Sequence, residues 1–130
     1  MVNKLPFLRF LPALFWAGII FALSTNNPAH LPKIQFLSWD KLGHFVFYFI
    51  LTGLLFWAIY NPNPKSAKHE LIAAISVFFC ASLYGMSLEF VQARLPYRSF
   101  DYADMLANCV GAFFALILYY IRKRRTIKYF

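Results

Sequence analysis

The sequence predicts an all-α, polytopic membrane protein, in which residues 1–130 form one domain: a four-helix transmembrane bundle with short loops. Two observations support this fold class. Hydrophobic residues make up 61% of the chain and charged residues only 14%, whereas soluble domains have about 45–50% and about 25%. The apolar residues also fall into four stretches, each near the roughly 20 residues that a helix needs to cross a bilayer.

The four expected spans are residues 7–24, 41–60, 71–92 and 104–121. The first span has a rival interpretation as a secretory signal peptide cleaved after Ser24, with Lys4 and Arg9 as its basic region. Its long apolar run and the bulky Trp16 in its middle favour a retained helix. The second span stops at Asn61-Pro62-Asn63-Pro64, because proline cannot continue a helix. The fourth is expected to start at Ser99 or Asp101 as its N-cap.

The basic residues predict the orientation of the bundle. Four spans place both termini and the middle loop on one side of the membrane. That side carries nine Lys and Arg residues against four on the other, the nine being Lys4, Arg9, Lys65, Lys68, Arg122, Lys123, Arg124, Arg125 and Lys128. Basic loops stay in the cytoplasm. We therefore expect an integral protein of the cytoplasmic membrane of a bacterium, with both termini cytoplasmic and the loop at 93–102 facing outward.

The net charge of +8 raises the question of a nucleic-acid partner. The basic residues stand at the ends of apolar stretches, and basic and aromatic residues do not alternate outside those stretches. That arrangement fits anionic lipid headgroups better than a nucleic acid. The sequence predicts membrane lipids as partners and no nucleic acid.

Polar side chains gather at the expected outer ends of three spans. Helical spacing places them on one face of each span, because residues three and four apart share a face. They are Lys41, His44 and Tyr48 in the second span, Glu89 and Gln92 in the third, and Asp104 and Asn108 in the fourth, with Arg98 and Asp101 in the preceding loop. Ionisable groups at this depth are costly and commonly functional. We predict an outward-facing polar pocket.

These segments resemble the VanZ-like family of small membrane proteins. The resemblance rests on Asp40-Lys41-x-x-His44-Phe45-x-x-Tyr48, Tyr84-Gly85-x-x-x-Glu89-x-x-Gln92 and Arg98-Ser99-Phe100-Asp101-x-x-Asp104-x-x-x-Asn108-x-x-Gly111. It covers about residues 10–120. The family is associated with resistance to the glycopeptide antibiotic teicoplanin, which acts outside the membrane. The resemblance therefore implies a cell-envelope setting and a lipid-linked or glycopeptide ligand.

Each polar residue has a functional and a structural interpretation. The candidate catalytic residues are His44, Glu89 and Asp101, and the candidate ligand-binding residues are Lys41, Gln92, Arg98, Asp104 and Asn108. As structural alternatives, His44 hydrogen-bonds Glu89 or Tyr84, and Asp101 and Asp104 cap the fourth helix and pair with Arg98. Glu89 needs a cation, and Arg98, Lys41 and His44 are available.

Three functions remain open from the sequence alone. The favoured function is recognition of a lipid headgroup or a cell-envelope component. The alternatives are a membrane-embedded hydrolase or transferase, with His44 as the base, and a small transporter. No cofactor and no metal centre are expected, although Asp101 and Asp104 with Glu89 or His44 offer oxygen-rich ligands for Mg²⁺ or Ca²⁺. Self-association of the bundle is also left open.

Overall fold

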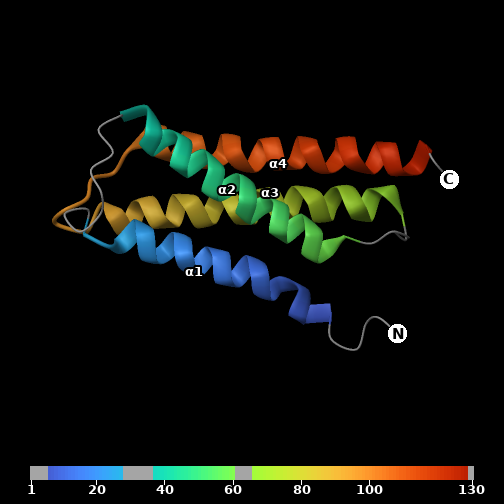
Figure 1. The fold of residues 1–130 in the computed structure, drawn as a ribbon, viewed down its shortest axis with the longest axis horizontal. Helices are drawn as coiled ribbons and strands as arrows, with labels where there is room; N and C mark the ends of the chain where they lie inside the picture. The colour runs from blue at the N-terminus through green and yellow to red at the C-terminus, as the bar shows by residue number, and fades with distance from the viewer. Residues whose placement is uncertain (1–5, 28–36, 61–65, 129–130) are drawn as a thin grey trace.

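The computed structural model describes residues 6–27, 37–60 and 66–128. A short 3-10 helix, η1 (Pro6–Phe10), leads into four α-helices: α1 (Leu11–Thr25), α2 (Leu37–Ile59), α3 (Ala67–Gln92) and α4 (Tyr102–Lys128) (Figure 1). The described residues contain no strand. The all-α fold class is confirmed. The predicted stop at Asn61–Pro64, and the side chains of Lys4, Lys33, Lys65, Arg124, Arg125 and Lys128, lie outside what the structure describes.

Each of the four described α-helices contributes a stretch long and apolar enough to cross a membrane. These stretches are Phe7–Thr25, Asp40–Ile59, Ala67–Gln92 and Tyr102–Lys123. The predicted four-span membrane bundle is therefore confirmed. The third helix begins four residues before the predicted start at residue 71, because the hydroxyl of Ser66 accepts a hydrogen bond from the backbone N–H of His69 (3.2 Å) and caps an extra polar turn.

Successive helices run in opposite directions (Figure 1). The start of α1, the end of α2 and the end of α4 lie at one end of the molecule. The end of α1, the start of α2 and the loop between α3 and α4 lie at the other. Helix α2 crosses the bundle obliquely and contacts each of the other three helices.

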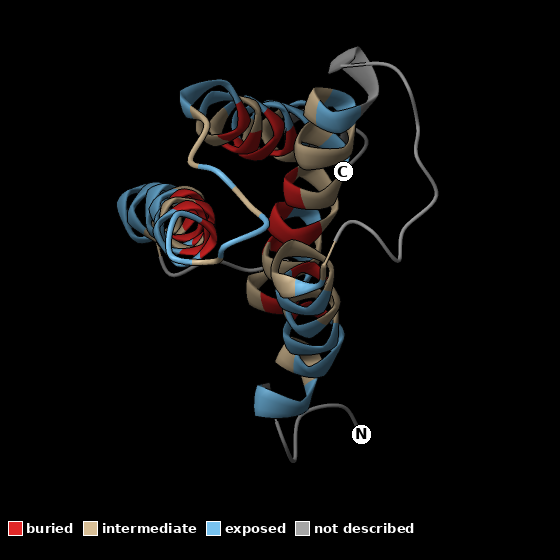
Figure 2. Ribbon diagram, turned by 90° about the vertical axis from the view of Figure 1, so that its left-hand side faces the viewer, coloured by how far each residue is buried: buried red, intermediate tan, exposed pale blue. Residues whose placement is uncertain are grey.

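Two apolar clusters hold the helices together. One contains Ala13, Ile20, Tyr48, Leu51 and Leu88, from α1, α2 and α3. The other contains Phe56, Ala74, Val77 and Ala115, from α2, α3 and α4. Seen end-on, the buried residues lie on the inward-facing sides of the helices and exposed residues face outward (Figure 2). Many of those exposed residues are large and apolar, as a lipid-facing surface requires.

Two glycines allow α4 and α3 to approach α2 closely. A Cβ atom on Gly111 would overlap the backbone carbonyl of Phe45 in α2. A Cβ atom on Gly85 in α3 would lie 2.9 Å from the ring of Tyr48 and 3.0 Å from the side-chain amide of Asn108. Small residues at these contacts bring helix backbones together in membranes. They also bring the polar ends of α2, α3 and α4 into contact range.

Candidate polar site at one end of the bundle

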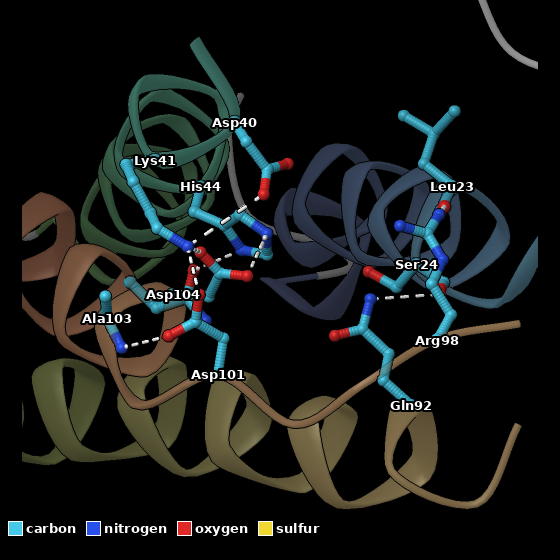
Figure 3. A network of polar contacts seen from close by, with 11 residues as sticks. Leu23, Ser24, Asp40, Lys41, His44, Gln92, Arg98, Asp101, Ala103 and Asp104 are labelled. Carbon is cyan, nitrogen blue, oxygen red and sulfur yellow. Dashed lines mark hydrogen bonds and ion pairs between the residues drawn. The ribbon is translucent and has the colours of Figure 1, made fainter. Parts of the chain in front are cut away.

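Lys41, at the start of α2, forms the centre of a charged cluster. Its ammonium group pairs with the carboxylates of Asp101 and Asp104 (Figure 3). A third carboxylate, that of Asp40, lies 4.0 Å from the same nitrogen. The lysine therefore joins α2 to the start of α4.

His44 lies one turn further along α2 and also faces α4. Its Nδ1 atom is 3.0 Å from Oδ1 of Asn108, and its Nε2 atom is 3.5 Å from Oδ2 of Asp104. Because an amide oxygen only accepts, Nδ1 carries the proton in this contact. Both ring nitrogens are thus directed at protein groups.

Asp101 and Asp104 have different surroundings although they are close in sequence. Asp104 is buried beside Lys41 and His44. Asp101 is half-exposed and occupies the N-cap position of α4, where its Oδ1 accepts a hydrogen bond from the backbone N–H of Ala103 (2.8 Å). The hydrogen bond from Lys41 and the bond from Ala103 hold the pKa of the Asp101 carboxyl below its usual value.

Glu89 is the most deeply buried carboxylate of the described residues, with 1% of its surface exposed. Its Oε2 atom has no hydrogen-bond partner among the described residues. It interacts electrostatically with His44, Asp104 and Asp101. Glu89 stands in α3, one turn after Gly85, and these interactions place its carboxylate next to the Lys41 cluster.

Gln92 and Arg98 do not join that cluster, because their described hydrogen bonds go to the end of α1. Arg98 donates to the backbone oxygens of Leu23 (3.0 Å) and Asn26 (3.2 Å), and Gln92 donates to that of Ser24 (3.0 Å). The last carbonyls of a helix lack partners within the helix. Gln92 thus ties the end of α1 to the end of α3, and Arg98 ties it to the loop after α3 (Figure 3).

The predicted site residues therefore fall into two sets. The first, here called the lysine cluster, contains Lys41, His44, Asp101, Asp104 and Asn108, with Asp40 and Glu89 beside it. The second is Gln92 and Arg98 at the end of α1. Arg98 was a predicted partner of Glu89 or of Asp101, and its described hydrogen bonds go to α1 instead.

Comparison with known proteins gives the family. The model of the VanZ/LLP1 family matches residues 4–123. The chain belongs to the VanZ/LLP1 family. It is similar to the uncharacterized protein C11E3.10 of Schizosaccharomyces pombe, with 32% identity over 89 residues, or 68% of this chain. The chain spans about half of that relative's length, since the match covers 51% of it. No solved structure matches the chain.

Within this VanZ/LLP1 chain, one donor set has the composition of a metal site. Ligand atoms of Asp40, His44 and Asp104 all lie within 4.8 Å of one another. The ammonium group of Lys41 is already paired with both aspartates, so it supplies the positive charge there. From the sequence, Asp40 was named only within the family motif and was not among the candidate site residues. Its spacing of four residues from His44, which puts both on one helix face, was the signal for including it.

A second charged group lies at the opposite end of the bundle. Glu70 in α3 pairs with Lys123 of α4 and accepts a hydrogen bond from the hydroxyl of Tyr119 (2.9 Å). Sequence reasoning did not single out this group, because Glu70 lies before the predicted third span and Lys123 after the fourth. The structure extends both helices far enough for these side chains to meet.

Proposed function

We propose that the lysine cluster recognises the polar headgroup of a lipid or a related cell-envelope component. The observation that carries the proposal is the convergence of Lys41, His44, Asp104 and Asn108 from α2 and α4, with Glu89 from α3 behind them. Burying several charged groups at the end of a small bundle is costly. Apolar residues would join these helices with less cost. A ligand-binding role accounts for retaining the polar ones.

The charge balance of the cluster favours a headgroup that carries an amine. Four carboxylates, from Asp40, Glu89, Asp101 and Asp104, stand against the single ammonium group of Lys41. One of the two carboxylate oxygens of Glu89 has no hydrogen-bond partner in the described part of the chain. Arg98, a candidate ligand-binding residue, donates to carbonyls of α1 and so adds no cation to the lysine cluster. An ammonium group on the ligand complements this acidic excess.

The contacts of His44 favour binding over catalysis. A general base needs a nitrogen within hydrogen-bond reach of the substrate. Both nitrogens of His44 face Asn108 and Asp104, so the imidazole holds α2 and α4 in register. The hydrolase or transferase hypothesis requires this ring to turn away from its partners.

The proposed orientation places the lysine cluster on the outer surface of the cytoplasmic membrane of a bacterium. The support is the excess of basic residues at the other end, nine against four. The family association with teicoplanin resistance fits a site on that surface, where glycopeptides act. We propose that the protein contributes to such resistance through this site.

Native mass spectrometry of the protein released from nanodiscs tests the headgroup proposal. We expect retention of phosphatidylethanolamine over phosphatidylcholine of the same acyl chains. Asp104→Asn should abolish this preference. Glu70→Gln, at the end of the bundle opposite to the lysine cluster, should keep it. Equal retention of both lipids by the wild type, or an equal effect of both substitutions, would contradict the proposal.

Cysteine labelling tests the orientation. Cys80 and Cys109 are free and are first replaced by alanine. Single cysteines are then introduced at two exposed positions, Ser99→Cys in the loop after α3 and Ala67→Cys at the start of that helix. A membrane-impermeant maleimide added to intact cells should label the first and spare the second. The reverse pattern would place the lysine cluster in the cytoplasm.

A further inference from the structure

A groove lies between α2 and α4 at the end of the bundle opposite to the lysine cluster. Its volume is about 440 Å³, within the range of about 300–1,000 Å³ for small-molecule sites. Its walls include Ile50 and Trp57 of α2 and Leu118 of α4. Gly53 also lines it, and a Cβ atom there would meet nothing within 4 Å. The missing side chain at Gly53 leaves the middle of the groove open.

The same groove ends at basic side chains. Arg122 and Lys123 of α4 line it, and Lys123 is paired with Glu70. Arg9 lies beside Trp57, a residue of the opposite wall, with its guanidinium carbon 5.4 Å from the centre of the Trp57 ring. It also donates to the backbone oxygens of Trp57 (2.7 Å) and Tyr60 (3.1 Å). Two basic side chains line this end of the groove, and a third, that of Arg9, lies near it, against the carboxylate of Glu70, so this end is positively charged.

We propose that this groove binds an anionic phospholipid, with an acyl chain along Gly53 and the phosphate beside Arg122. The apolar length of the groove matches an alkyl chain, and its charged end matches a negatively charged headgroup. Arginine is suited to phosphate because its planar fork donates two parallel hydrogen bonds. The aromatic ring of Trp57 at the rim is typical of side chains at the level of lipid headgroups.

This binding site is separate from the lysine cluster, and its ligand has the opposite charge character. The groove uses the second halves of α2 and α4, whereas the cluster uses the start of each helix. Failure of one proposal therefore leaves the other standing. Under the orientation proposed above, the groove opens to the cytoplasmic leaflet, where basic residues meet anionic lipids.

Quenching of Trp57 by brominated lipids tests the proposal in the full chain. Trp16→Phe and Trp39→Phe leave Trp57 as the sole tryptophan of the protein. The protein is reconstituted in mixtures of phosphatidylcholine and phosphatidylglycerol in which only one lipid carries bromine. We expect phosphatidylglycerol to occupy the site about fivefold more readily, the factor that one basic side chain near anionic lipid supplies. Native mass spectrometry of the chain with all its tryptophans should show one retained phosphatidylglycerol.

Two substitutions and two matched controls separate the groove from the general lipid surface. Gly53→Leu fills the groove and should remove the quenching preference and the retained lipid, whereas Gly18→Leu, at a glycine of α1 that is equally open, should keep both. Arg122→Gln should lower the ratio of phosphatidylglycerol to phosphatidylcholine occupancy to near one. Arg94→Gln, in the loop at the opposite end of the bundle, should leave this ratio unchanged. Equal quenching by the two lipids in the variant whose sole tryptophan is Trp57 would overturn the proposal. A preference for phosphatidylglycerol that survives both Gly53→Leu and Arg122→Gln would overturn it too. So would a lipid-free dimer that buries Trp57.

Discussion

Gly111 of α4 packs directly against the backbone carbonyl of Phe45 in α2, so closely that a methyl group at this glycine would overlap the carbonyl oxygen. Phe45 directly follows His44, and Gly111 lies about one turn after Asn108. His44 and Asn108 are joined across the same interface. The polar cluster and the glycine contact are therefore two parts of one helix–helix junction. Loss of the close approach would separate the cluster's two halves.

Gly111→Ala should destabilise the bundle, because the added methyl group meets backbone rather than a side chain that can move. Overpacking of this kind costs about 1–3 kcal/mol. Unfolding in detergent, followed by circular dichroism, measures the change. Gly53→Ala is the control, since its methyl group enters open space and should cost nothing. Equal stability of the two variants would show that α2 and α4 are not in close contact.

The hydrogen bond between Lys41 and Asp101 should make stability depend on acid pH. The pKa of Asp101 is lower in the folded protein than its unfolded value of about 3.9. The folded state thus gains stability above that value and loses it as pH falls through the lowered pKa. Titration of the free energy of unfolding from about pH 6 down to pH 2 measures this loss. Lys41→Met should flatten that part of the profile, and an unchanged profile in this variant would contradict the assignment.

The two glutamates of α3 should respond in opposite ways to neutralisation. Glu89 is buried with one oxygen unpartnered among the described residues, so Glu89→Gln removes a buried charge and should raise the stability. Glu70 is paired with Lys123 and Tyr119, so Glu70→Gln should lower it. Thermal unfolding of both variants in the same detergent makes the comparison. A marked loss of stability in Glu89→Gln would mean that this carboxylate has a partner essential to the fold.

The fold followed from the sequence because membrane-spanning helices are specified locally. Length and apolarity alone mark a span, and the basic residues at its ends mark its limits. Even the cap at Asp101 was among the expected start positions of the fourth helix. The extra turn before residue 71 was missed because Lys68 and Glu70 are polar, although Ser66 supplies the cap that extends the helix.

The site was less predictable because it depends on how helices cross. Helical spacing put Lys41, His44, Asp104 and Asn108 at one end, and the structure brings them together. Spacing contains no information about α1, whose final carbonyls take the hydrogen bonds of Gln92 and Arg98. The groove beside Gly53 could not be predicted from the sequence either, because it forms only where α2 and α4 diverge.

A double-mutant cycle between Lys41 and Asp104 tests most directly whether α2 and α4 build one polar cluster. Lys41→Met, Asp104→Asn and the combined variant are unfolded in the same detergent, and their stabilities are compared with that of the wild type. The structure predicts a coupling energy within the range of about 0.5–3 kcal/mol seen for residues in contact. Stability changes that add within about 0.3 kcal/mol, as they do for distant residues, would contradict the account, because the two side chains would then belong to separate surfaces.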